Sequence, residues 1–500
     1  MTSDDGPLFI AIDVGTTGAR ASAVDLAGHL LQEARKPYET TAPKPGWAEQ
    51  DPRDWRESSL DALAELVIAI GDRPVAAVGL TGQCPTIAPL DAEREPVGPG
   101  LLYRDNRAGE QATEMRRRFG EDRMHERTGH LAEAFHVGPK VLWMRERAPD
   151  VFAATDCFMQ PRDVALHALT AVSATDETHA NSTVFFDLVE RCWATDLLEE
   201  FSLTQSLFPQ VHPAWTIVGE IGGEMACRAK ALRGCPVILG AADSQCAQYG
   251  SAVAGPGPIS EMAGASSCLN ALVEKPLRDT RVTHYSYLEP DWYSTELGVN
   301  TTGAALRWAV TQLGFEDFAA LDAAAQRGRE TIRAGRGADP RQLAPVFLPY
   351  LGDGERDDVA LRAAFIGLSD RHTRDELAYA VLEGVAFAVA DTLDILRQAG
   401  LPVEELRVAG GVTRVSALGA ITADVLGVPV RHLTQDSAPV GVALLAAAVV
   451  GFAAESAAAL SANLATAQTF EPDAAARDAI LTRYRWFLDV RGASAVRVTS

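Results

Sequence analysis

The chain has 500 residues, of which 47% are hydrophobic and 22% charged, so two or three domains with their own cores are expected. A formal net charge of −22 disfavours non-specific binding to nucleic acid or to an anionic membrane, although a local cluster of donors can still hold a phosphorylated ligand. None of the seven cysteines has CxxC spacing, and the acidic N-terminus does not resemble a signal peptide. These features favour a reduced, cytoplasmic setting.

The first predicted element is a β-hairpin near the N-terminus. Residues 9–12 are typical of a buried strand, and residues 20–25 return to an extended, alternating pattern. Between them, Asp13 is followed by the turn Gly15-Thr16-Thr17-Gly18, whose N–H and hydroxyl groups can face a polyanion. The turn lacks the Gly-Lys-Ser/Thr of a Walker A loop and the following helix of a dinucleotide site. An ordinary glycine-rich hairpin with a capping aspartate is the alternative.

Two further stretches of the N-terminal half place polar residues after apolar ones. A predicted helix begins near Pro52, and a predicted buried strand over residues 74–80 leads to Gln83 and Cys84. Another short apolar run precedes Asp105 and Arg107. Charged groups at the end of a buried strand are costly unless they are paired, so Asp105 and Arg107 either pair with each other or meet a ligand.

A predicted strand over residues 236–239 ends in small residues that are followed by Asp243. The small residues let a ligand approach the carboxylate, and a helix is expected from Cys246 onward. Asp243 as an N-cap of that helix is a second interpretation, compatible with the first.

The C-terminal half begins after a composition break at residues 255–258, Gly-Pro-Gly-Pro, which predicts a domain hinge. Residues 259–268 then form a strand and small-residue turn that echo the first hairpin. A later strand ends at Gly410 and Gly411, where a flat ring can lie against the backbone. The apolar run over residues 440–454 is too short to span a bilayer comfortably and predicts a buried helix.

Together these stretches resemble the FGGY family of carbohydrate kinases, and most closely its xylulokinase-like members. The C-terminal signature of that family matches residues 363–368 and 376–384, and the N-terminal signature matches around residues 140–146 but has Val137 where Pro, Ser or Thr is usual. Further matches, in family order, are residues 13–20, 46–52, 240–245 and 424–427.

The resemblance implies an α/β protein of two actin-like ATPase (ribonuclease H-like, ASKHA) domains around a central cleft. Residues 1–250 would form the N-terminal domain, with the sugar site and the catalytic base, and residues 251–500 the nucleotide-binding domain. It also implies transfer of the γ-phosphoryl group of ATP, with Mg²⁺, to a sugar hydroxyl. The partners would be the sugar and ATP, with no nucleic acid and no membrane, and a homodimer is possible.

The family positions also imply roles for individual residues. Asp243 would be the catalytic base, and Asp13 and Asp243 would hold Mg²⁺. The residues expected to bind ATP are Asp13, Gly15, Thr16, Thr17, Arg20, Gly264, Ala265, Ser266, Gly303, Gly410 and Gly411. The residues expected to bind the sugar are Gln83, Cys84, Tyr103, Asp105, Arg107, Asp243 and Ser244.

Three positions depart from the family pattern. Ala265 replaces a threonine of the second phosphate turn, with Ser266 or Ser267 as possible substitutes for the lost hydroxyl. An asparagine usual beyond the double glycine is absent near Val415. Gln83-Cys84-Pro85 lacks both the histidine of xylulokinases and the Arg-Glu pair of glycerol kinases.

The expected function is an ATP-dependent kinase for a ketopentose such as xylulose. A kinase for another polyol, sugar acid or ketose (ribulose, gluconate or a glycerol-like substrate) is the first alternative, because Cys84-Pro85 makes that wall of the pocket less polar. A non-catalytic sugar- or nucleotide-binding regulator on the same fold is the second. Retention of Asp13, Arg20 and Asp243 argues against the regulator, since a binder needs no base.

Overall fold

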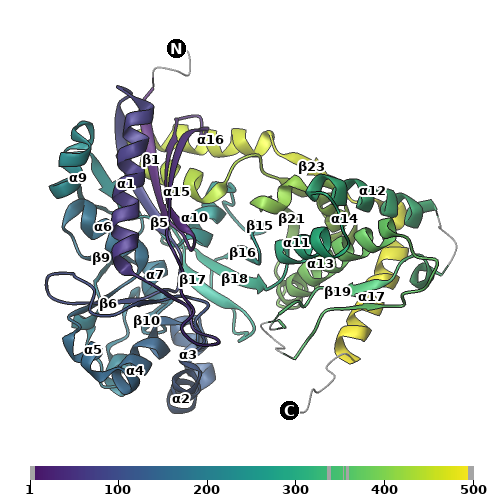
Figure 1. The fold of residues 1–500 in the computed structure, drawn as a ribbon, viewed down its shortest axis with the longest axis horizontal. Helices are drawn as coiled ribbons and strands as arrows, with labels where there is room; N and C mark the ends of the chain where they lie inside the picture. The colour runs from purple at the N-terminus through teal and green to yellow at the C-terminus, as the bar shows by residue number, and fades with distance from the viewer. Residues whose placement is uncertain (1–5, 335–338, 353, 356–359, 494–500) are drawn as a thin grey trace. The chain divides into compact units, whose positions relative to one another are not determined.

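The computed structural model describes residues 6–334, 339–352, 354–355 and 360–493. The chain forms two compact units, each a β-sheet with helices packed on it (Figure 1). Unit 1 comprises Met1–Ala252, Val273–Thr295 and Ser437–Ala462, and unit 2 comprises Val253–Leu272, Glu296–Asp436 and Asn463–Ser500. The chain therefore first leaves unit 1 after Ala252 and returns to it twice, whereas the sequence interpretation placed one boundary after residue 250.

The sheet of unit 1 has six strands in the order β13-β14-β5-β1-β2-β3. Strand β1 runs antiparallel to β2 and parallel to β5, which in turn is parallel to β14. The bounds of these strands are β1 Leu8–Val14, β2 Gly18–Val24, β3 Leu30–Pro37, β5 Val75–Gly82, β13 Ile217–Glu220 and β14 Pro236–Ile238. Since β1, β5 and β14 are parallel, their carboxyl ends lie at one edge of the sheet.

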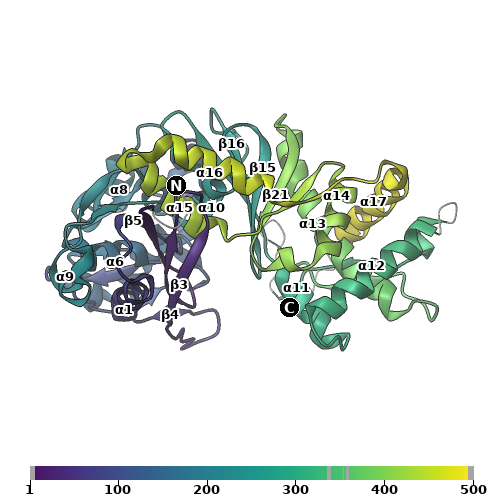
Figure 2. The ribbon, with the colours of Figure 1, turned by 90° about the horizontal axis from the view of Figure 1, so that it is seen from above.

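Helices cover both faces of this sheet (Figure 2). Alternate residues of β1, from Leu8 to Val14, join Trp55 and the apolar side chains of α1 and α6 in one core. On the other face, α15 packs against β1 and β5, and Gly79 comes so close that an added Cβ would lie 2.9 Å from the carbonyl oxygen of Val442. The helices of unit 1 are α1 Pro52–Ile70, α2 Gly109–Phe119, α3 Glu121–Thr128, α4 Val137–Arg147, α5 Pro149–Ala154, α6 Pro161–Thr170, α7 Glu177–Asn181, α8 Thr195–Glu200, α9 Gly223–Arg228, α10 Asp243–Gly250 and α15 Ser437–Ala447.

Helix α15 is the buried helix expected from the apolar run, and all of its residues are buried. The helical segment Ser437–Ala465 is long and apolar enough to cross a membrane by composition, but 61% of its most apolar window is buried inside the protein. It is also kinked at Val450 and Gly451, beyond which α16 (Ala453–Ala465) begins. Helix α15 explains why the chain returns to unit 1, because it covers the second face of the six-stranded sheet.

In unit 2, strands β16, β15, β21, β22 and β23 lie side by side in this order. The predicted hinge overlaps the start of β15, so Gly257 and Pro258 are already part of a strand. The helix α13 is the centre of the helical layer and contacts α11, α12, α14 and α17. The bounds are β15 Gly257–Ala263, β16 Ser267–Val273, β21 Val403–Ala409, β22 Val430–His432, β23 Gln468–Phe470, α11 Gly303–Gln312, α12 Phe318–Ala334, α13 Arg374–Gln398, α14 Ser416–Leu426 and α17 Arg477–Ala493.

Candidate active site

The tip of the predicted hairpin lies at the carboxyl end of β1. Asp13 pairs with Arg20 across β1 and β2, and Arg20 Nη2 donates a hydrogen bond of 2.8 Å to Asp13 Oδ2. The turn is closed by a 3.2 Å hydrogen bond from the N–H of Gly15 to the carbonyl of Gly18. The Asp13 side chain keeps 16% of its surface exposed, so one carboxylate and one guanidinium are held together beside the turn.

Polar side chains bind the carbonyl oxygens of this turn. Tyr38 Oη and Gln83 Nε2 both donate to the carbonyl of Gly15. Gln50 Nε2 donates to the carbonyl of Thr16 over 2.7 Å, and Gln50 Oε1 accepts from the indole of Trp55. These bonds hold the backbone of the turn in place, and the exposed Thr17 presents its hydroxyl on the surface, where an anionic ligand can reach it.

Gln83 is part of this support. It is 2% exposed, its Nε2 also donates to Gln50 Oε1, and its Oε1 accepts from Thr86 Oγ1. Cys84 next to it is half-buried, and Tyr103 is 39% exposed. The sugar contacts expected of Gln83, Cys84 and Tyr103 stay predictions.

Asp105 and Arg107 pair with each other, which was one of the two alternatives drawn from the sequence. Arg107 Nε and Nη2 donate to the two oxygens of Asp105 over 2.9 and 2.7 Å, and the N–H of Ala48 donates to Asp105 Oδ2. Arg107 also binds Glu49, and its guanidinium lies 3.5 Å from the centre of the Trp47 ring. Asp105 is 0% exposed and fixes the loop that contains Trp47 and Glu49. The sugar contacts expected of Asp105 and Arg107 stay predictions.

Asp243 lies beyond the end of β14, at the same sheet edge as Asp13. The connection is tight: Gly240 has φ +71°, and a Cβ there would come within 1.7 Å of the carbonyl oxygen of Leu80. Thr81 Oγ1 donates to the carbonyl of Ala241, and the N–H of Ala242 donates to Thr178 Oγ1. The edge formed by β1, β5 and β14 therefore gathers Asp13 and Asp243, with polar side chains around them.

Asp243 is the first residue of α10, and Ala242 takes the N-cap position. The N-cap interpretation of Asp243 is therefore wrong by one residue. Its Oδ1 accepts a 2.8 Å hydrogen bond from the N–H of Ser244, and the side chain is partly exposed. A carboxylate in the first turn of a helix interacts favourably with the helix dipole.

Unit 2 carries the second turn expected to bind phosphate. Gly264, Ala265 and Ser266 are exposed, and the N–H groups of Gly303 and Ala304, at the start of α11, donate to the carbonyls of Gly264 and Ala265. A Cβ on Gly303 would lie 2.2 Å from the Gly264 oxygen, so the turn and the helix meet only because this residue is glycine.

The two serines after Ala265 differ in their surroundings. Ser266 is exposed on the turn. Ser267 is 1% exposed, and its hydroxyl lies 2.7 Å from Glu261 Oε1 and 3.0 Å from Thr302 Oγ1. Of the two expected substitutes for the missing threonine hydroxyl, Ser266 is thus the one on the surface.

The two glycines after β21 also differ. Gly410 has φ +109°, and a Cβ there would lie 2.3 Å from the carbonyl oxygen of Ala263. Gly411 has open space at its Cβ position. Gly410 is thus required for close packing between β15 and β21, whereas Gly411 presents bare backbone of the kind a flat ring can lie on.

Glu261, behind the second turn, gives the protein a pH-dependent stability. Burial raises the pKa of Glu261 to about 7, although the hydrogen bond from Ser267 opposes this. The folded protein then holds a proton that the unfolded chain has lost, so stability falls as pH rises from the unfolded pKa through about 7. Glu261→Gln removes this dependence: it should melt like the wild type near pH 5 and higher near pH 8, the effect reaching about 3 kcal/mol.

Thermal melting at the two pH values measures the effect. The comparison must be made between wild type and variant at each pH. Burial also raises the pKa of Glu177 to about 7, so the stability of both proteins falls with pH for this second reason. Equal melting temperatures of wild type and Glu261→Gln at both pH values would contradict the assignment.

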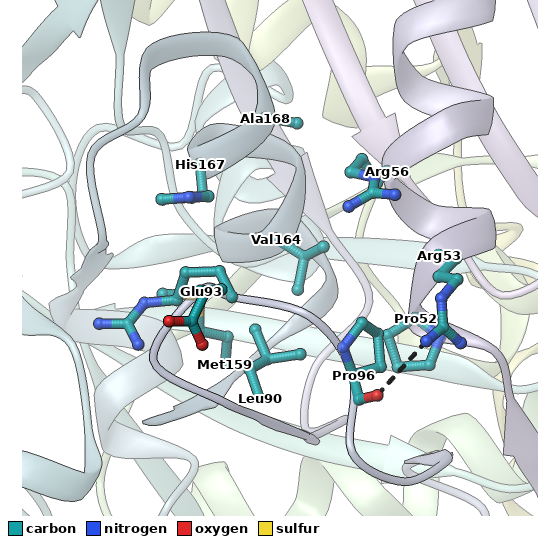
Figure 3. A pocket seen from close by; sticks show the side chains of 11 residues that line it. Pro52, Arg53, Arg56, Leu90, Glu93, Pro96, Met159, Val164, His167 and Ala168 are labelled. Carbon is teal, nitrogen blue, oxygen red and sulfur yellow. Dashed lines mark hydrogen bonds between the residues drawn. The ribbon is translucent and has the colours of Figure 1, made fainter. Parts of the chain in front are cut away.

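A cavity of about 190 Å³ lies elsewhere in unit 1 (Figure 3). It contains Arg53, Arg56 and Arg94, and each of these has a carboxylate partner: Asp51, Glu95 and Asp156, respectively. None of the site residues predicted from the sequence lines it. The residues that do are Pro52, Arg53, Arg56, Leu90, Glu93, Arg94, Pro96, Met159, Val164, His167 and Ala168.

Comparison with known proteins identifies the family. The models of the N-terminal and C-terminal domains of the FGGY family of carbohydrate kinases match residues 8–250 and 261–450. The chain is 28% identical to a xylulose kinase of Escherichia coli, over 89% of this chain and 90% of that one. It is also 28% identical to a glycerol kinase of Nocardia farcinica, over 88% and 90%.

Solved structures agree with this result. The crystal structure of xylulose kinase from Rhodospirillum rubrum is 28% identical and superposes with a TM-score of 0.85, covering 97% of this chain and 98% of that one. A second kinase structure, from Brucella ovis, gives 26% identity and a TM-score of 0.86 over 97% and 99%. The chain belongs to the FGGY family of carbohydrate kinases, has its α/β actin-like ATPase fold, and is an ATP-dependent phosphotransferase with an alcohol group as acceptor.

Proposed function

We propose that this kinase phosphorylates a ketopentose such as xylulose, with Asp243 as the catalytic base. The observation that carries the base assignment is the place of Asp243, partly exposed after β14 at the sheet edge that also holds Asp13. The sugar is suggested by the relatives, since the E. coli protein and the R. rubrum structure are xylulose kinases.

Phosphoryl transfer from ATP passes through a loose transition state, so the protein has mainly to align the groups and stabilise charge. Asp243 accepts the proton of the attacking hydroxyl, and a carboxylate is basic enough because that proton leaves late. Arg20 and the hydroxyl of Thr17, on the turn that begins at Gly15, stabilise the transferred phosphoryl group. Ser244, adjacent to Asp243 and 6% exposed, lines the acceptor side.

The residues at the sheet edge fit a magnesium ion held with the nucleotide. Mg²⁺ keeps several waters and takes one or two carboxylates plus phosphate oxygens. Asp13 and Asp243 provide two carboxylates, and the described residues contain no group of three acidic, His or Cys side chains that would make a closed protein cage. When bound, the ion would neutralise charge on the phosphates.

In this proposal the two units have different roles. Unit 1 binds the sugar and supplies the base, close to the role expected of residues 1–250. Unit 2 binds the nucleotide, with the Gly264–Ser266 turn at the phosphates and Gly411 beside the adenine. The reaction takes place in the cytoplasm, where thiols stay reduced, and all seven cysteines are free thiols in the structure.

The test is a coupled assay of ADP release with Mg-ATP against a panel of pentuloses, hexuloses, polyols and aldonates. A rise of orders of magnitude with xylulose supports the proposal. A comparable rise only with glycerol, gluconate or another acceptor replaces the ketopentose by that substrate. No rise with any acceptor contradicts the proposed reaction.

Ala265 gives a gain-of-function prediction. Ala265→Thr restores a hydroxyl on the exposed second turn and is expected to raise kcat a few-fold, the worth of about one hydrogen bond. Ala265→Val has nearly the same shape without the hydroxyl and is the control. Steady-state kinetics with xylulose and varied ATP measure the change, and an equal effect of the two substitutions would contradict the hydroxyl's role.

A further inference from the structure

We propose that Thr178 is a positioning residue that holds the backbone next to Asp243 in its productive place. The inference rests on the proposed role of Asp243 as the base. It concerns a side chain distant in sequence, since Thr178 is 64 residues away from the Ala242 that it binds.

The contact is direct and buried. The N–H of Ala242 donates to Thr178 Oγ1 over 2.8 Å, and Thr178 Oγ1 donates in turn to Asp176 Oδ2 over 2.6 Å. Thr178 is 1% exposed and Ala242 2% exposed, so water does not replace either bond. Ala242 is the residue immediately before Asp243, and its N–H therefore fixes the peptide that leads into the base.

Thr178 is itself rigidly held, because it belongs to a buried ionic cluster. Asp176 Oδ2 also accepts from the N–H of Thr178, and Asp176 Oδ1 accepts from Arg162 Nη2 and lies 2.6 Å from His179 Nδ1. Burial on its own would raise the pKa of Asp176, but His179 and Arg162 lower it to about 2. Asp176 is therefore a permanent anion at neutral pH.

The same cluster binds the other end of the connection that carries the base. Arg162 Nη1 donates to the carbonyl of Leu239 over 2.6 Å. Arg162 thus holds the chain just before Gly240, and Thr178 holds it just after Ala241. One rigid group of side chains clamps both ends of the turn between β14 and Asp243.

Helix α10 is also fixed by its packing on α15. A Cβ on Gly441 of α15 would lie 2.0 Å from the carbonyl oxygen of Cys246, and one on Gly250 would lie 1.9 Å from that of Ser437. The body of α10 is thus docked on α15 by glycine contacts that do not involve Thr178. Loss of the Thr178 hydroxyl is expected to shift the first turn of α10, where Asp243 lies, and to leave the rest of the helix in place.

The experiment compares Thr178→Val with Thr178→Ser and with a matched control, Thr183→Val. Thr183 is 2% exposed, and its hydroxyl binds the carbonyl of Ala180 and the N–H of Phe185, with no bond to the segment before Asp243. Asp243→Asn is measured alongside. Each variant is tested for kcat, for KM of xylulose and of ATP, and for thermal melting.

Thr178→Val is expected to lower kcat roughly ten- to hundredfold with little change in KM of ATP, because a small displacement of a catalytic group costs rate more than binding. Thr178→Ser keeps the hydroxyl and should retain kcat within about threefold. Thr183→Val should lose thermal stability as Thr178→Val does and yet keep its kcat. If Thr178→Val does not fold, Thr178→Ala, which removes the hydroxyl without adding an apolar group to the cluster, takes its place.

The outcomes separate the two proposals. In one outcome, Asp243→Asn lowers kcat strongly while Thr178→Val and Thr178→Ala keep the wild-type kcat. That result overturns the positioning role of Thr178 and leaves the base assignment of Asp243 standing. The positioning role is equally overturned if Thr183→Val lowers kcat as much as Thr178→Val. If Asp243→Asn itself keeps full activity, the proposed base is wrong, whatever Thr178 does.

Discussion

Asp243→Asn is expected to lower kcat by about 10²–10⁴-fold, the usual contribution of a general base. The substitution keeps the size of the side chain, and the amide oxygen can still accept the hydrogen bond from the N–H of Ser244. A neutral amide cannot take the proton of the attacking hydroxyl. The chemical step should therefore fail while the fold and the first turn of α10 persist.

The measurement is kcat with saturating xylulose and Mg-ATP, together with ATP affinity by calorimetry and thermal melting. Affinity for ATP measured without Mg²⁺ should change little, because Asp243 is proposed to meet the nucleotide only through the ion. Asp196→Asn is the control, since Asp196 lies in α8 of the same unit and pairs with Arg127 on the surface. A variant Asp243→Asn with kcat within about threefold of wild type would exclude Asp243 as the base.

The parts of the site that the sequence predicted are those set by local pattern. Asp13 and Arg20 flank a turn between two apolar strands, so a hairpin that brings them together follows from spacing alone, and the observed register pairs them. Asp243 follows a short apolar strand and small residues, and the structure has that strand, the tight Gly240 and a helix that begins at Asp243. The family resemblance supplied the roles that these residues are expected to have.

What the sequence could not predict is which distant groups meet. Residue type does not reveal that Gln83 is hydrogen-bonded to Gln50, Thr86 and the carbonyl of Gly15. For Asp105 the sequence left two alternatives open, and the structure has the pairing with Arg107. These partners come from loops whose course depends on the whole fold. The buried cluster around Asp176 has the same origin: residues 176–183 are a visible run of polar side chains, but which groups they meet depends on the fold.

The structure also gives a physical reason for a residue of the C-terminal family signature. Glu383 is 1% exposed in α13, and both of its oxygens accept from Arg483 Nε of α17, over 2.8 and 3.0 Å. Arg483 is 0% exposed and also donates to the carbonyls of Ala344 and Pro345, and Tyr379 Oη donates to Glu383 Oε1. This pair therefore ties α17 and the segment before β19 (Val346–Leu348) to the central helix of unit 2.

Arg483→Met is expected to lower the free energy of unfolding by about 3–5 kcal/mol, because Glu383 would be left as a buried charge without its partner. Urea denaturation of the full chain measures the loss. The control is Arg327→Met: Arg327 forms a similar two-bond pair with Asp375 at the start of α13, but its side chain is 58% exposed. Water solvates the carboxylate left behind there, so that variant should lose far less stability.

A double variant distinguishes a buried-charge effect from simple loss of packing. Arg483→Met with Glu383→Leu removes both charges and should be more stable than Arg483→Met alone, because no ion is then left unpaired in the interior. Recovery should be partial, since the carbonyls of Ala344 and Pro345 and the hydroxyl of Tyr379 lose their partners as well. If the double variant is no more stable than the single one, packing around α13, and not the charge of Glu383, accounts for the loss.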